Sequence, residues 1–270
     1  NGKIPGQSEF EMAEELFQSK KYTAWLSVLE MAVVKNHPKA IIRKGDSYFL
    51  GLGVDKNYSE ALKWYKKAAE LNSLNALYLV GIVYKDTLIE GKTYADAVEY
   101  YLMLNGKEIA ATNTLIGEAY LNGVGVEKDI VSAKRWFEKG IAQSDPGSVF
   151  NMGYLYQKGI GVKADMKKAL ELMAQSCDSN YLRACETLGE IYYKGEDVDA
   201  NVEETVRWYT QGTRLNGAKS HFYFSNYILL GYIDGDKSDA LYNAKRAKEL
   251  GYDPVACDWL QLKINGEMHE

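Results

Sequence analysis

A glycine that recurs every 36 residues is the feature that most constrains how this chain can fold. Glycine stands at positions 45, 81, 117, 153 and 189, and a tyrosine follows three residues after each. Sixteen residues after the first four glycines the chain has alanine, and Thr205 takes that place after the fifth. Nineteen and twenty residues after each glycine stand two mostly bulky residues, such as Trp64-Tyr65 and Trp136-Phe137. A fixed period of this length is the signature of a repeat protein.

Each period predicts two helices joined by a turn. The glycine-rich turns read GLGV at 51–54, GVGV at 123–126, GIGV at 159–162 and, less regularly, GEDV at 195–198. In the third period we expect a helix over 108–122 that ends at Gly123, because glycine adopts left-handed backbone angles at little cost. Asp129 is a suitable N-cap for a second helix reaching about residue 142, and Pro146 then opens the next helix.

The sequence therefore predicts an all-α fold, an α-α superhelix (solenoid) of about six to seven helical hairpins with a 36-residue period. We expect an N-terminal capping hairpin over 1–38 and a C-terminal capping helix and tail over 253–270. Between them, the predicted repeats cover 39–73, 74–107, 108–145, 146–179, 180–217 and 218–252.

The columns of small and large residues predict how the helices pack. Glycine in the first helix and alanine in the second let the paired helices approach, and aromatic residues such as Trp136 fill the gap between successive periods. On this interpretation Trp136 is a core residue, and Trp136→Ala costs about 3–5 kcal/mol.

Residues 117–140, with the sequence GEAYLNGVGVEKDIVSAKRWFEKG, closely resemble the Sel-one-like repeat, a relative of the tetratricopeptide repeat. The resemblance extends over about 39–250, although TLIEGK at 87–92 replaces the glycine turn of the second period and the sixth period is partial. It implies a right-handed superhelix of hairpins that acts as an adaptor or scaffold. Bacterial relatives often occur in the cell envelope or in host interaction.

Charge and hydropathy exclude some classes of partner. The formal net charge is -5, and lysine and arginine are spread along the chain without a basic block, so we do not expect a nucleic-acid partner. No apolar run approaches the roughly 18 residues of a membrane-spanning helix, and the first residues lack a signal-peptide pattern. We expect a soluble chain without membrane insertion, and we favour a monomer over an oligomer.

Cys177 and Cys185 lie eight residues apart across the turn between two periods. Their placement is similar to that in the helicobacter cysteine-rich group of this family, which implies a disulfide and favours export, to the periplasm or beyond, over the cytoplasm. The alternative is a pair of small buried thiols in helix interfaces. Cys257 occupies a second cysteine position of that group, but Glu249 stands where its partner would be.

We find no pattern that predicts catalysis, a metal or a cofactor. The three histidines are far apart in the sequence and lack cysteine or carboxylate neighbours at ligand spacing. Some relatives in the cysteine-rich group are described as penicillin-binding proteins or β-lactamases, so a hydrolase is the alternative function. This chain has no S-x-x-K motif combined with the other β-lactamase motifs. A structural subunit of an envelope or secretion assembly is a third alternative.

We therefore predict a non-catalytic scaffold that binds a protein or peptide in the concave groove lined by the first helices. Positions three before, one after and four after each glycine lie on the arc opposite the paired helix, and they are rich in aromatic and acidic residues. The alternative is that neighbouring first helices contact each other and bury some of these rings. The predicted partner-binding residues are Phe49, Tyr78, Ile82, Glu118, Phe150, Tyr154, Glu186, Glu190, Tyr193 and Phe222; Ile42 and Asp46 share the same arc. This composition favours a ligand with basic and apolar side chains.

Overall fold

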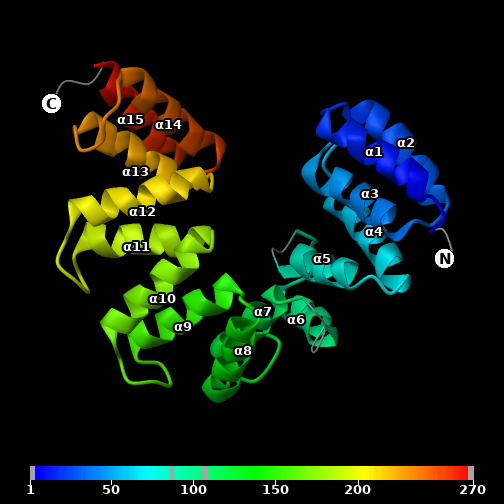
Figure 1. The fold of residues 1–270 in the computed structure, drawn as a ribbon, viewed down its shortest axis with the longest axis horizontal. Coiled ribbons are helices and arrows are strands. Elements are labelled where there is room, and N and C mark those ends of the chain that lie inside the picture. Colours follow the sequence, from blue (N-terminus) through cyan, green and yellow to red (C-terminus); the bar gives the residue numbers. More distant parts are fainter. Residues whose placement is uncertain (1–3, 86–87, 105–108, 267–270) are drawn as a thin grey trace. The chain divides into compact units, whose positions relative to one another are not determined.

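The computed structural model describes residues 4–85, 88–104 and 109–266, and within these ranges the chain forms fifteen α-helices and no strand (Figure 1). The predicted boundary between residues 107 and 108 lies within 105–108, outside the described residues. The helices are α1 (Gln7–Gln18), α2 (Tyr22–Val34), α3 (Pro38–Leu50), α4 (Tyr58–Glu70), α5 (Leu74–Lys85), α6 (Tyr94–Met103), α7 (Ala111–Asn122), α8 (Ile130–Ala142), α9 (Pro146–Lys158), α10 (Met166–Asp178), α11 (Leu182–Lys194), α12 (Val202–Arg214), α13 (Ala218–Leu229), α14 (Lys237–Glu249) and α15 (Pro254–Asn265).

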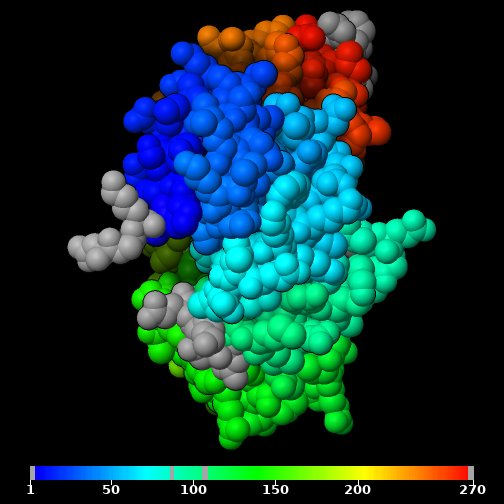
Figure 2. All heavy atoms as spheres, turned by 90° about the vertical axis from the view of Figure 1, so that its right-hand side faces the viewer, coloured from blue at the N-terminus to red at the C-terminus, as the bar shows by residue number. Residues whose placement is uncertain are grey.

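Successive helices pair as hairpins, and the chain divides into two compact units, residues 1–136 and 137–270. In the first unit α1 contacts α2, α3 contacts α4 and α5 contacts α6. In the second, α9 pairs with α10, α11 with α12, and α13 with α14. The hairpins of the first unit lie as successive layers, seen as bands of dark blue, lighter blue and cyan in Figure 2. This succession confirms the predicted all-α fold of helical hairpins.

The turn within a hairpin follows one pattern of backbone angles and hydrogen bonds. Gly51 ends α3 with a φ of 74°, in the left-handed region that favours glycine. Asn57 then caps α4 by accepting a hydrogen bond from the N–H of Glu60 at 3.0 Å, and its own N–H donates to the carbonyl of Tyr48 at 2.8 Å. The same backbone bond joins Asp129 to Tyr120, Asp165 to Tyr156 and Asn201 to Tyr192.

The glycine column faces the residue twenty positions later. A Cβ atom added at Gly45 would lie 2.4 Å from Cε1 of Tyr65, and one added at Gly189 would lie 2.9 Å from Cε1 of Tyr209. Both rings are almost fully buried. Only glycine leaves room for these rings, so each of these two periods carries both parts of its own small-to-large contact.

Trp136 is not the fully buried residue of its period. Its side chain is only partly buried, whereas the next residue, Phe137, is fully buried. Trp64 and Tyr65 show the same difference. One residue turns a helix by about 100°, so in the Trp64–Tyr65 pair it is the second aromatic that faces the glycine, Gly45. Trp136 packs against the core cluster that contains Tyr101 and Ile116, as predicted, but it is only partly buried there.

Candidate partner-binding surfaces

The first helices of the first three hairpins, α1, α3 and α5, surround a cavity of about 430 Å³. Its apolar lining comes from Phe10 on α1, Ile42 on α3, and Tyr78 and Leu79 on α5. A cavity of this size and composition can hold one or a few side chains of a binding partner. We call it the α1–α3–α5 cavity.

A chain of ion pairs and hydrogen bonds lies along one side of this cavity. The guanidinium of Arg43 donates two hydrogen bonds to Glu14, from Nε at 3.0 Å and from Nη2 at 2.8 Å. Its Nη1 lies 3.6 Å from Oδ2 of Asp46, whose Oδ1 accepts a hydrogen bond from the Tyr65 hydroxyl at 2.9 Å. The network therefore connects α1, α3 and α4.

Burial and hydrogen bonding shift the ionisation of this network in opposite directions. The hydrogen bonds to Glu14 raise the pKa of Arg43. Burial raises the pKa of the Asp46 carboxyl, against the lowering effect of the Tyr65 hydroxyl and Arg43. Burial thus disfavours the charged form of Asp46 more strongly than Tyr65 and Arg43 favour it.

The structure brings together only part of the predicted set in the first unit. Tyr78 lines the cavity, as do Ile42 and Asp46 from the same predicted arc. Phe49 is half-buried and packs edge-on against the ring of Tyr58, with centroids 5.3 Å apart. Ile82 packs against the core, and Glu118 is half-buried on α7. Neither Ile82 nor Glu118 lines the cavity.

The prediction that Phe150 projects into a groove is wrong. Its side chain is 3% exposed and belongs to the core cluster that contains Met173 and Cys185. The ring of Tyr181, from the turn before α11, lies 5.6 Å from the ring of Phe150. Tyr154, one helical turn further on, is half-buried against the same cluster. Lateral packing between hairpins therefore buries Phe150, as in the alternative interpretation.

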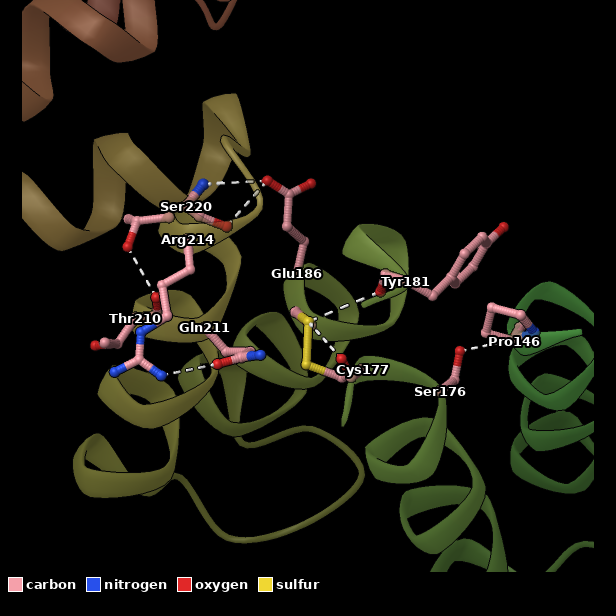
Figure 3. The surroundings of a disulfide bond; sticks show 11 residues. Pro146, Ser176, Cys177, Tyr181, Glu186, Thr210, Gln211, Arg214 and Ser220 are labelled. Carbon is pink, nitrogen blue, oxygen red and sulfur yellow. Dashed lines mark hydrogen bonds between the residues drawn. A yellow bond between two sulfur atoms is a disulfide. The ribbon is translucent and has the colours of Figure 1, made fainter. Parts of the chain in front are cut away.

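Cys177 and Cys185 are joined by a disulfide in the structure, with an S–S distance of 2.04 Å (Figure 3). The bridge connects the last turn of α10 to the first turn of α11. The next residue, Glu186, reaches the following hairpin, where its Oε1 accepts hydrogen bonds from the backbone N–H and the hydroxyl of Ser220, both at 3.1 Å. Glu186 thus stabilises the start of α13 instead of facing an open groove.

The other predicted acidic residue of α11, Glu190, forms ion pairs with Lys194 at 2.7 Å and Lys219 at 3.0 Å. Its hydrogen bonds to these lysines lower the pKa of the carboxyl. It borders a smaller cavity of about 180 Å³. Tyr193, also on α11, is 49% exposed.

Aromatic rings extend from Tyr193 across the second unit. Tyr193 lies 5.1 Å from Tyr223, which stacks on the buried Tyr209 with centroids 4.6 Å apart. The predicted Phe222 contacts Tyr223 edge-on and stacks on Tyr252 at 4.6 Å. Phe222 therefore takes part in packing between hairpins, and Tyr193 is the most accessible of these rings.

Sequence reasoning missed six residues of the α1–α3–α5 cavity, namely Phe10, Glu14, Lys39, Arg43, Asn75 and Leu79. The glycine column does not extend to α1, so the repeat does not indicate which face of that helix carries Phe10 and Glu14. Arg43 stands two residues before Gly45, outside the chosen arc. The opposite charges of Glu14 and Arg43, 29 residues apart, were the available signal.

The described residues hold neither a metal-binding cluster nor a helix that could span a membrane. In these ranges no three His, Cys, Asp or Glu side chains gather as a metal site. Likewise, no helix in the described part of the chain has both the length and the apolar character needed to cross a bilayer.

Solved structures resemble the chain over most of its length. A Sel1 repeat protein from Oxalobacter formigenes superposes with a TM-score of 0.68 at 24% identity, covering 89% of this chain and 99% of that one. The protein c5321, a protective antigen of uropathogenic Escherichia coli strains that displays an SLR fold, gives a TM-score of 0.57 at 20% identity. That match covers 97% of this chain and 57% of the other. At these identities the likeness shows the fold alone.

Two curated proteins match shorter stretches. The ERAD-associated E3 ubiquitin-protein ligase component HRD3B of Arabidopsis thaliana is 33% identical over 104 residues, 38% of this chain and 16% of that protein. Activator of C kinase protein 1 of Saccharomyces cerevisiae is 27% identical over 114 residues, 37% of this chain and 18% of that protein. The matches therefore span less than a fifth of either relative.

The family match rests on the repeats themselves. The model of the Sel1 repeat matches residues 36–73, 111–145, 146–181 and 182–217, which together make up more than half of the chain. These segments include α3–α4, α7–α8, α9–α10 and α11–α12, the helices that are joined by the glycine-containing turns. The chain therefore belongs to the Sel1 repeat family.

Proposed function

We propose that this protein is a non-catalytic interaction scaffold that binds a segment of another protein in the α1–α3–α5 cavity. Sel1 repeat proteins are generally protein-interaction scaffolds. The observation that carries the proposal is the composition of the cavity, where four apolar side chains lie beside the network of Glu14, Arg43 and Asp46. Ligand sites in proteins typically combine an apolar wall with a few placed polar groups.

The second unit offers a smaller contact surface around Tyr193. This exposed ring lies on α11, one turn after Glu190, and tyrosine is enriched at binding hot spots. The names of the curated relatives, a ligase component and an activator of a kinase, describe proteins that act through another protein. They support an adaptor role for this chain.

The test is affinity capture with a blocked cavity. Asn75 lines the cavity and is exposed, so Asn75→Trp fills the space without removing a core contact. Met31→Trp, at an exposed position on α2, is the matched control. Proteins from source-cell lysate and envelope fractions that are retained by the wild type and Met31→Trp but lost with Asn75→Trp support the proposal. Equal retention by all three variants contradicts it.

The two alternative functions have separate tests. For the hydrolase, the test is turnover of a chromogenic β-lactam that a single Ser or Glu substitution abolishes. For a structural subunit of an envelope or secretion assembly, the test is co-purification. The protein should then be isolated from its source cells as part of a stable complex.

A further inference from the structure

The charges of the α1–α3–α5 cavity are separated along α3, and this separation bears on which partner segment fits. Lys39 and Asp46 both line the cavity. They are seven residues apart on one helix, so their Cα atoms are separated by about 10 Å along the helix axis. One end of the cavity wall is therefore cationic and the other is anionic.

The two ends are not equally neutralised within the protein. Arg43 lies between them, but Glu14 takes both of its short hydrogen bonds. Asp46 keeps one neutral donor, the Tyr65 hydroxyl, and the longer 3.6 Å contact with Arg43. Glu14, Arg43 and Asp46 together carry one net negative charge. Lys39 is exposed at the far end of the wall.

Apolar surface lies between the charged ends. Ile42 stands between Lys39 and Asp46 on α3, and Tyr78 and Leu79 face the same cavity from α5. A cation that enters beside Asp46 gains an ion pair in a partly desolvated site, where charges interact more strongly than in bulk water. A second cation near Lys39 is repelled.

We propose that the partner segment presents a basic side chain to Asp46 and an acidic one to Lys39, with an apolar side chain between them against Ile42 and Tyr78. The separation of about 10 Å equals three residues of extended chain or two turns of helix. This inference rests on the proposed function, because it names the class of partner for that same cavity.

The test begins with a selection that makes no assumption about charge. A phage library of random peptides is panned against the full chain, and clones that also bind Asn75→Trp are discarded. One peptide that depends on the cavity is then synthesised in three forms: as selected, with its basic residue replaced by Gln, and with its acidic residue replaced by Gln. Binding of each form is measured by fluorescence anisotropy.

The protein variants assign each charge to its end of the cavity. Replacing the basic residue should weaken binding to the wild type about tenfold, as expected for loss of one partly buried charge pair, but less than about twofold to Asp46→Asn. Replacing the acidic residue should weaken binding to the wild type and should not weaken binding to Lys39→Gln. Tyr65→Phe is the structural control, because it removes the hydroxyl bonded to Asp46 and keeps the carboxylate. It should retain the preference for the basic residue.

The possible failures are distinguishable. The charge assignment is overturned if the cavity-dependent peptides lack a basic residue. It is also overturned if Asp46→Asn still prefers the peptide with the basic residue over the one with Gln. Either result leaves the proposed function standing. Loss of the preference in Tyr65→Phe as well shows that Asp46 acts through local structure, which also overturns the assignment. If no selected peptide depends on the cavity, the proposed function fails together with the inference.

Discussion

At the scale of single residues, the contact between Gly45 and Tyr65 limits what the core can accept. Gly45→Ala places a methyl group 2.4 Å from Cε1 of Tyr65, so either the ring or the helix must move. We expect a loss of about 1–3 kcal/mol of unfolding free energy, measured by urea denaturation. Tyr65→Leu in the same chain should recover part of this loss. If the loss in the double variant equals the sum of the losses in the two single variants, the two residues do not interact through this contact.

The ionisation of Asp46 provides a second test at this scale. Burial raises its pKa above the ordinary value for aspartate, while the Tyr65 hydroxyl lowers it. A raised folded-state pKa means that Asp46 favours folding most at low pH and that this contribution is lost as the pH rises through the raised value. Tyr65→Phe should raise the pKa further, as followed by NMR of the Asp46 carboxyl carbon. Tyr58→Phe, on the same helix, should leave it unchanged.

At the scale of helices and their connections, the bridge between α10 and α11 closes a short loop. In the chain-entropy model, a loop of this length stabilises the fold by about 2–3 kcal/mol. Urea unfolding with and without reductant should show this difference for the wild type and not for Cys177→Ala/Cys185→Ala. Peptide mapping without reductant should recover the two cysteines linked. Free thiols at both sites after oxidising purification would contradict the bridge.

The start of α13 depends on a side chain from the preceding hairpin. Glu186→Ala leaves the N–H and the hydroxyl of Ser220 without their acceptor, which should cost about 1–2 kcal/mol. Hydrogen exchange of the first amides of α13 should become faster than in Glu196→Ala, a control in the exposed turn after α11. Unchanged exchange in α13 would show that Glu186 is free to meet a partner.

Features that depend on residues close in the sequence could be predicted, whereas features that depend on contacts with another hairpin could not. The 36-residue columns contain the turn glycines, the N-cap at Asp129 and the start of α9 at Pro146, because these depend on local backbone chemistry. Phe150 and Glu186 were misjudged because their surroundings come from the next hairpin. The α1–α3–α5 cavity was not predicted for the same reason, because its network joins Glu14 to Arg43 across two hairpins.

At the scale of the whole molecule, a repeat chain should respond locally to damage. The residues around Gly189 lie in the second compact unit, residues 137–270. Gly189→Ala brings a Cβ within 2.9 Å of the Tyr209 ring, so we expect faster amide exchange around α11 and α12. Exchange in residues 4–85 should be unchanged. Equal acceleration throughout both units would show that the chain unfolds in one cooperative step.

The pairing of a column glycine with the ring twenty positions later has a consequence for how such a chain changes over evolutionary time. Gly45 with Tyr65 and Gly189 with Tyr209 each lie inside one hairpin, so a duplicated or deleted stretch of 36 residues carries both partners with it. Gene duplication can then lengthen or shorten the array without separating a glycine from its ring. Substitution of one partner alone is penalised. Descent should therefore alter the number of hairpins more readily than the residues of this pair.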